Sequence, residues 1–208
     1  MDNAEIVLIG VTLGALAAWL GKAAIMRDYG MNYNGTPRAV KIGTVELKAM
    51  RGLDVPKIMQ SSNVRAFLKA IRVLETGDGP NAYRMLNGGC LFTGFADHPV
   101  STLTKARELC PLKKGETNRT TAAGAYQFVF ASWKEAAMQM GLSDFTPGNQ
   151  DSAAIGRISS RGALGYVASG DIDSAFDALP KEFDSLRRDG ARERLRQEYK
   201  KAGGSFDA

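Results

Sequence analysis

The stretch NVRAFLKAIRVLETGDG, residues 63–79, decides the fold predicted for this chain. Its apolar residues recur at the spacing of one helix face, at Val64, Phe67, Leu68, Ile71 and Leu74. Asn63 is a suitable N-cap, and Gly77 is a stop signal. We therefore predict an amphipathic helix that ends near Glu75.

Glu75 occupies the last turn of this helix, where proteins usually place Lys or Arg. A carboxylate there faces the negative end of the helix dipole, which disfavours the charged form and raises the pKa. Partial burial would add to the effect and keep the acid protonated near neutral pH, as a glycosidase requires of its proton donor. The glycine-containing loop at 76–79 could bring backbone close to a ligand. The alternative is a surface glutamate at a fraying helix end.

The same periodicity predicts further helices at about 130–140, 147–161, 171–178 and 190–202. GGCLFTGF, residues 88–95, is typical of a strand or short hairpin. The predicted fold class is therefore α+β, a mostly helical domain over 63–208 with a small β element. Glycines and prolines punctuate residues 29–62, which we interpret as a connector.

Composition limits the chemistry. The chain has 208 residues, of which 44% are apolar and 24% charged, as in globular proteins. Its net charge of +5 favours polyanionic surroundings such as nucleic acid, anionic lipid or bacterial wall polymers. His98 is the single histidine, which excludes most metal amidase schemes. We expect no metal, no cofactor and no specific nucleic-acid partner.

Two small clusters have more than one interpretation. Cys90 and Cys110 could form a disulfide, worth about 3 kcal/mol in the chain-entropy model, or remain free thiols in a reducing compartment. We interpret the second cluster, Asp97, His98 and Pro99, as a turn with a structural histidine.

Residues 6–26 contain one charge, Lys22, in a run about as long as the roughly 20 residues of a bilayer-spanning helix. We predict an N-terminal apolar helix over 1–28, either a membrane anchor or a helix buried in an assembly of virion or tail proteins. Small residues recur every fourth position, a face that could form a homo-oligomer, at Gly10, Gly14 and Ala18.

The charges around this apolar run oppose ordinary export. Asp2 and Glu5 precede it, whereas a cleavable signal begins with Lys or Arg. Lys22 and Arg27 would keep its C-terminal side in the cytoplasm, which is awkward for an enzyme that acts outside. We therefore favour a virion component over a host inner-membrane or periplasmic enzyme.

AAGAYQFVFASW, residues 122–133, combines a flexible Gly124 with Tyr126 and Gln127. Saccharide sites use aromatic faces for stacking and amides for paired hydrogen bonds, so this mixture suits a sugar-binding cleft. Equally, the large aromatic residues of the segment could belong to the core, at Phe128, Phe130 and Trp133.

Four segments in this order resemble the phage lambda endolysin family of peptidoglycan lytic transglycosylases: FLKAIRVLETGDG, NGGCLFTGFADHP, TAAGAYQFVFASWKEAAMQMGLSDFTPGNQDSAA and SRGALGYVASGDIDSAF. The resemblance implies a lysozyme-like domain in which Glu75 is the catalytic acid. It also implies that Gly124, Tyr126 and Gln127 line the cleft opposite this acid. Further substrate contacts are expected from Thr76, Asp78, Tyr83 and Phe183.

The resemblance implies cleavage of the β-1,4 bond between N-acetylmuramic acid and N-acetylglucosamine in peptidoglycan glycan strands. One carboxylate suffices if the C6 hydroxyl of the muramic acid attacks C1 and closes a 1,6-anhydro ring. If Asp78 or Asp97 served as a second carboxylate, the enzyme would be a hydrolytic muramidase. A third alternative is an inactive virion structural or wall-binding protein.

Overall fold

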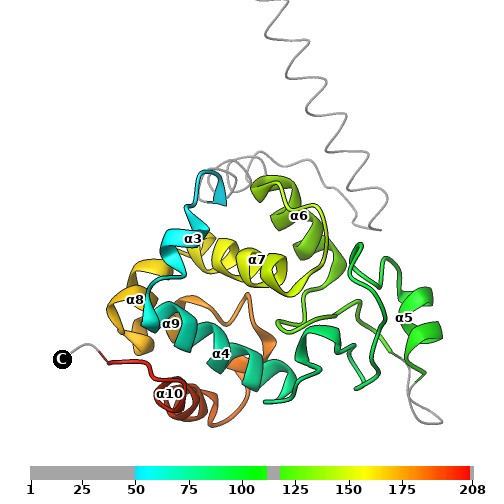
Figure 1. The fold of residues 1–208 in the computed structure, drawn as a ribbon. Coiled ribbons are helices and arrows are strands. Elements are labelled where there is room, and N and C mark those ends of the chain that lie inside the picture. Colours follow the sequence, from blue (N-terminus) through cyan, green and yellow to red (C-terminus); the bar gives the residue numbers. More distant parts are fainter. Residues whose placement is uncertain (1–49, 112–117, 207–208) are drawn as a thin grey trace, which may run out of the picture. The chain divides into compact units, whose positions relative to one another are not determined.

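The computed structural model describes residues 50–111 and 118–206 (Figure 1). The predicted apolar helix over 1–28, with its face of Gly10, Gly14 and Ala18, lies outside these ranges. Within them, no helix has the length and apolar character needed to cross a membrane.

The described residues are mostly helical, with short helices connected by turns (Figure 1). In chain order these helices are α3 (Val55–Ile58), α4 (Ser62–Thr76), η1 (Ala82–Arg84), α5 (Leu103–Leu109), α6 (Phe130–Met140), α7 (Pro147–Ser160), α8 (Leu164–Ser169), α9 (Ile172–Ala178), η2 (Asp184–Arg187) and α10 (Ala191–Lys201). The long helices fall where the sequence predicts them. The structure adds α3, α5 and α8, which are too short to show a clear period.

Helix α4 lies at the centre of this arrangement, and α8, η2 and α10 all pack against it. Its predicted apolar face is buried, including Phe67, Leu68 and Ile71. Burying each of these side chains stabilises the fold by about 1.5–3 kcal/mol. Ser61, not Asn63, caps the helix, because the Ser61 hydroxyl accepts from the N–H of Val64 at 3.4 Å.

Asn63 instead holds the end of the domain against the start of α4. Its side-chain amide donates to the carbonyl of Ala168 at 3.1 Å, and its Oδ1 accepts from the N–H of Ser205 at 3.0 Å.

Residues 50–62, which the sequence assigns to a connector, contain α3 and contribute Met50 to the core.

An aromatic cluster fills the space under α6. The Trp133 and Phe145 rings meet edge to face with centroids 4.7 Å apart, and the Phe128 ring lies 6.5 Å from that of Trp133. Phe128 and Trp133 are buried, which supports the core interpretation for both. Phe130 is only partly buried.

The small β element is less regular than a hairpin. In the described part of the chain it consists of three isolated antiparallel bridges, which pair Met85 with Leu91, Leu86 with Ala123, and Ala123 with Phe128.

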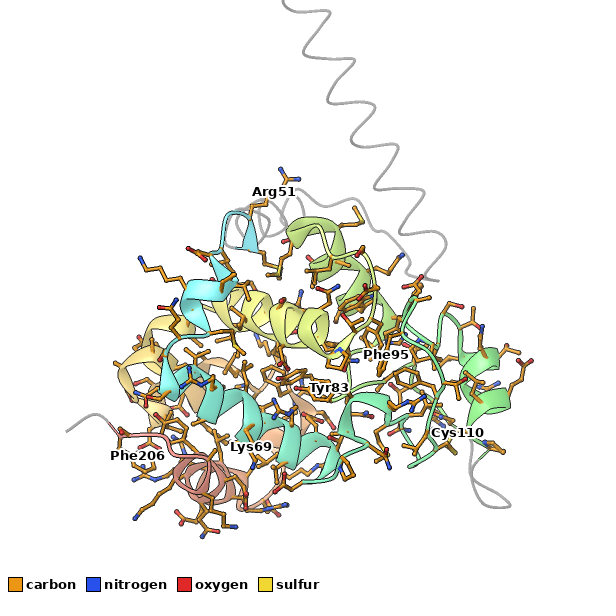
Figure 2. The ribbon with its side chains drawn as sticks, viewed as in Figure 1. Arg51, Lys69, Tyr83, Phe95, Cys110 and Phe206 are labelled. Carbon is orange, nitrogen blue, oxygen red and sulfur yellow. A yellow bond between two sulfur atoms is a disulfide. The ribbon has the colours of Figure 1, made fainter. Side chains whose placement is uncertain are left out.

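A disulfide joins Cys90 to Cys110 at the end of α5 (Figure 2). It closes the segment that carries α5 and corresponds to about 3 kcal/mol of stabilisation by the chain-entropy model.

His98 is a structural residue. The residue is 5% exposed, and its ring lies against that of Phe145, with centroids 4.8 Å apart. Nδ1 accepts from the N–H of Val100 at 3.2 Å, so Nε2 carries the proton and donates to the carbonyl of Phe128 at 2.8 Å. Burial lowers the pKa of His98 to about 4.

This burial predicts a loss of stability in mild acid. The unfolded chain takes up the His98 proton near pH 6.5, whereas the folded chain resists it down to about pH 4. The contribution of His98 to the free energy of unfolding is therefore complete above about pH 6.5 and falls by about 3 kcal/mol as the pH drops to about 4. Chemical denaturation across this range measures the loss. His98→Gln, whose amide can still donate to Phe128, should show a flatter curve; parallel curves would contradict the prediction.

Candidate active site

Glu75 lies in the last turn of α4, beside η2. Gly77 ends the helix with φ +85°, and no basic side chain occupies the last turn. The N–H of Ser185 donates to Oε1 of Glu75 at 3.2 Å. Burial raises the pKa of Glu75; the contacts with Ser185 and the charge of Arg188 oppose this shift without cancelling it. Glu75 is thus half-buried, and its pKa is shifted upward, the direction that a proton donor requires.

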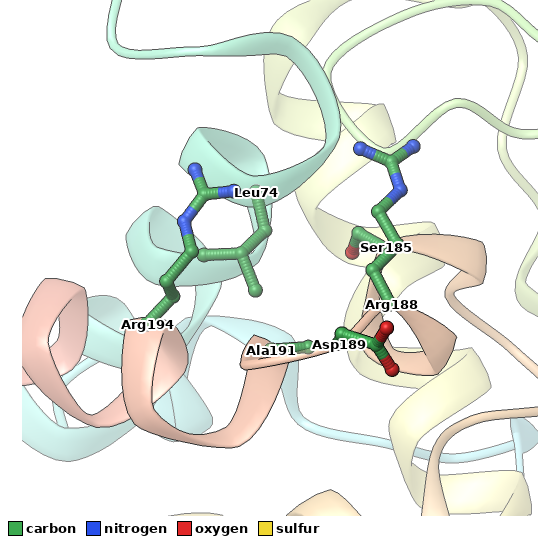
Figure 3. A pocket seen from close by; sticks show the side chains of 6 residues that line it. All are labelled: Leu74, Ser185, Arg188, Asp189, Ala191 and Arg194. Atoms are coloured by element: carbon green, nitrogen blue, oxygen red, sulfur yellow. The ribbon is translucent and has the colours of Figure 1, made fainter.

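A groove of about 420 Å³ opens beside Glu75. Two segments supply most of its lining: residues 120–132, which include Tyr126 and Gln127 and which we call the first wall, and residues 181–188, which we call the second wall. This volume falls within the range of ligand pockets. A second pocket behind Ser185 holds about 10 Å³, space for roughly one water molecule (Figure 3). The groove is therefore the candidate active site.

The turn at 124–127 holds an unusual backbone conformation. Gln127 has φ +47°, the one positive value outside glycine in the described ranges. Its Nε2 donates to the carbonyls of Met85, at 3.2 Å, and Gly124, at 2.9 Å. Such strain persists where surrounding contacts over-determine it, and it clusters at functional sites. These bonds fix the Gln127 side chain on the groove wall.

Tyr126 belongs to a buried polar network beneath the groove. Its hydroxyl donates to Oδ1 of Asp151 at 2.6 Å and accepts from Arg72 at 3.3 Å. Burial raises the pKa of Tyr126 well above its usual value, which keeps the hydroxyl a donor. Arg72 precedes Glu75 by one helical turn, so the network ties the end of α4 to the 124–127 turn and to α7.

Comparison with known proteins identifies the family. A family model described as Endolysin matches residues 65–206. The chain belongs to the endolysin family. It is 34% identical over 131 residues to the endolysin of Escherichia phage lambda, covering 60% of this chain and 77% of that relative. It is 31% identical over 166 residues to the endolysin of Escherichia phage P2, covering 72% and 98%.

Solved structures show the same fold. Bacteriophage lambda lysozyme complexed with a chitohexasaccharide is similar with a TM-score of 0.58 and 32% identity, over 70% of this chain and 96% of that one. A second structure of lysozyme from bacteriophage lambda gives a TM-score of 0.57 and 29% identity, over the same shares. The lysozyme-like α+β fold expected of this endolysin family member is therefore confirmed.

The structure brings three of the sequence-predicted site residues onto the groove: Glu75, Tyr126 and Gln127. Thr76 and Asp78 do not line it. The Thr76 hydroxyl donates to the carbonyl of Arg72 at 3.0 Å, and the exposed Asp78 pairs with Lys69 at 3.9 Å.

Two residues predicted to contact the substrate, Tyr83 and Phe183, instead contact other residues of the fold. Tyr83 lies between α4 and α7 (Figure 2), and its hydroxyl donates to Asp151 at 2.8 Å. Phe183 is 1% exposed, in the core, with its ring 6.5 Å from that of Tyr126. Neither residue lines the groove. Tyr83 shares Asp151 with Tyr126, and the Phe183 ring lies near that of Tyr126, so both support the position of Tyr126.

Gly124 also lies beneath the wall. It has φ +78°, and an added Cβ would come within 2.3 Å of Oε1 of Gln150 and 2.8 Å of the Phe145 ring. Oε1 of Gln150 accepts from the N–H of Ala125 at 2.9 Å, so the close approach of Gly124 to Gln150 shapes the turn. Glycine is required here by both backbone and space.

Gly124→Ala should therefore lower the free energy of unfolding by about 2–5 kcal/mol, from the left-handed backbone and the overpacked side chains together. Gly141→Ala is the matched control, since Gly141 has φ +69° and open space at its Cβ position. It should cost about 1–2 kcal/mol. Chemical denaturation compares the two variants, and equal losses would show that packing against Gln150 contributes nothing.

The second wall of the groove is where prediction from sequence missed most. Glu182, Asp184, Arg187 and Arg188 all line it. Their one sequence signal is the dense run of charges in KEFDSLRRD, residues 181–189, which has no helical or strand period. Their role depends on the contact between η2 and the end of α4, a pairing of distant segments.

Proposed function

We propose that this chain is a phage enzyme that degrades peptidoglycan by cleaving the β-1,4 bond between N-acetylmuramic acid and N-acetylglucosamine. The observation that carries the proposal is Glu75, a half-buried acid with a raised pKa at the side of a 420 Å³ groove. A protonated carboxyl in this place can donate to a glycosidic oxygen. The chitohexasaccharide complex of the lambda lysozyme supports an oligosaccharide as the occupant.

Lytic transglycosylation needs only one catalytic carboxylate, and the positions of the sequence-predicted candidates for a second one agree with this reaction. Asp78 and Asp97, the candidates for a second catalytic carboxylate, do not line the groove; Asp97 is exposed and lies 3.8 Å from Lys134. Glu182 does line it, but its carboxylate is bound by Arg157 at 2.9 Å and by Arg161 at 3.0 Å. These bonds occupy the lone pairs of the carboxylate, so Glu182 is poorly placed to activate a water.

In the proposed mechanism Glu75 acts twice. It first gives its proton to the leaving oxygen, and the C1–O bond breaks. The resulting carboxylate then accepts the proton of the muramic acid C6 hydroxyl as that oxygen bonds to C1. Because the nucleophile is already part of the reacting sugar, its attack is intramolecular and benefits from the entropy of positioning. The N–H of Ser185 is placed to stabilise the carboxylate between the two steps.

Hydrolysis is the second candidate, because Asp184 lines the same groove as Glu75 and is exposed to solvent. A carboxylate there could activate a water molecule. Product analysis separates the two reactions. Mass spectra of digested sacculi should show anhydro-muramic ends, which are lighter than reducing ends by one water. Ordinary reducing ends, together with a large loss of activity in Asp184→Asn, would assign a muramidase.

For the biological setting we propose host lysis. Both curated relatives are endolysins, which supports this role; the virion location favoured from the N-terminal charges receives no support from the comparisons. The choice between a membrane anchor and an assembly helix over 6–26 remains a prediction from sequence. Mass spectrometry of purified particles tests the setting, since abundant protein in the virion would restore the other assignment.

A further inference from the structure

The two walls of the groove differ in charge. The wall at 120–132 presents neutral side chains, among them Thr120, Gln127, Val129 and Ser132. Cations gather on the second wall, at Lys181, Arg187 and Arg188, which we call the cationic rim. All three are exposed, and Asp184 is the exposed acid among the groove-lining residues described.

We propose that the cationic rim binds the carboxylates of the peptide stems of peptidoglycan, so that the enzyme selects peptide-bearing strands over bare glycan. The inference rests on the proposed function, because it concerns the same groove. Each N-acetylmuramic acid of peptidoglycan carries a short peptide with free carboxylates, whereas the sugar rings themselves are neutral. A strand bound with its sugars along the neutral wall could turn its anionic branches toward the rim.

The rim cations remain available for a ligand. Lys181 and Arg188 form no ion pair with any residue in the described ranges. Figure 3 shows the Arg188 guanidinium extending away from the neighbouring carboxylate of Asp189. Arg187 donates from Nε to the carbonyl of Pro180 at 2.7 Å and lies 3.5 Å from Asp184, which orients its guanidinium and leaves further N–H groups open.

Three arginines elsewhere in the domain are bound by acids. Arg157 is bound by Glu182 and Glu135 within the fold, and Arg192 and Arg196 on α10 are bound by Asp173. The rim differs from these paired arginines because it holds two cations, Lys181 and Arg188, next to the groove without an ion pair to any described residue. Guanidinium and ammonium groups in such a place recognise carboxylates, and the field they create speeds the encounter with an anionic polymer.

The test compares two substrates with two variants. The substrates are intact peptide-bearing strands and the same strands after an amidase has removed the peptides. Lys181→Gln/Arg187→Gln removes two of the three rim charges and keeps Arg188, whose charge acts on Glu75. Lys57→Gln/Lys105→Gln is the matched control, because neither lysine lines the groove.

For the unmodified chain, kcat/KM should be higher on peptide-bearing strands. The rim variant should lower this preference about five-fold at low ionic strength, and added salt should reduce the difference. Any indirect effect of the variant on Glu75 changes kcat/KM for both substrates. The ratio of the two kcat/KM values therefore isolates the peptide contact. Activity on bare strands also shows that the variant is folded.

Three outcomes would overturn the inference. An unchanged ratio in the rim variant would reject it while leaving the proposed function intact. A ratio that falls equally in the control variant would assign the effect to net charge. An unchanged ratio with lost binding to phosphatidylglycerol vesicles would assign the rim to lipid. If the unmodified chain cleaved neither substrate, the proposed function itself would fail.

Discussion

Glu75→Gln should abolish most of the catalytic activity, with a fall in kcat of about 10²–10⁴-fold and toward the upper value if Glu75 serves both as acid and as base. Glutamine has nearly the same shape but no proton to donate at neutral pH. Its side-chain oxygen can still accept from the N–H of Ser185, so the fold and the groove should be retained. Solubilisation of labelled sacculi measures the rate.

The same variant gives a second, independent signal. Burial raises the pKa of Glu75, so the folded chain holds this proton to higher pH than the unfolded chain does. The stabilising contribution of Glu75 is therefore present below its ordinary pKa of about 4.5 and is lost as the pH rises through the folded value. Glu75→Gln lacks this loss and should be the more stable protein above that range.

Asp184→Asn is the control for a charge effect on the groove. Asp184 raises the pKa of Glu75, so its removal should leave the activity largely in place and shift the profile of rate against pH to lower pH. Full activity in Glu75→Gln would contradict the catalytic assignment. A loss in Asp184→Asn as large as that in Glu75→Gln would instead indicate two catalytic carboxylates.

The sequence predicted the central helix and its acid because both depend on local signals. The apolar period of α4 fixes which face is buried, and Gly77 fixes where the helix ends, so the place of Glu75 in the last turn follows from neighbouring residues. The cap was missed by two positions, since Ser61 and Asn63 are both suitable N-cap residues. The choice depends on the long-range bonds that occupy Asn63.

The supporting wall could not be predicted in the same way. Ser185 is 110 positions from Glu75 along the chain, and Asp151 is 68 from Tyr83. No local pattern specifies such pairs. Gly124, Tyr126 and Gln127 are all predicted to line the cleft, yet Gly124 is required for packing against Gln150. An aromatic side chain such as Phe183 gives the same signal in a sequence whether it stacks on a sugar or fills the core.

Arg157→Met should produce a large loss of stability, about 3–5 kcal/mol in the free energy of unfolding. The side chain of Glu182 is 3% exposed, and Arg157 donates to both of its oxygens. Removing the guanidinium leaves a buried carboxylate with reduced compensation, which costs far more than the net value of an ion pair. Because Glu182 and Arg157 also line the groove, the activity should fall with the stability.

A double-mutant cycle shows whether this loss comes from the unpaired charge. Arg157→Met/Glu182→Met removes both charges, so it should be more stable than Arg157→Met alone. Arg192→Met is the matched control: Arg192 also pairs with two acids, Asp173 and Asp177, but its side chain is 42% exposed, so the loss should stay within about 1 kcal/mol. If Arg157→Met lost no more than Arg192→Met, the remaining bond from Arg161 at 3.0 Å would be enough to satisfy Glu182. The buried pair would then orient two groove-lining side chains and would not be a condition for folding.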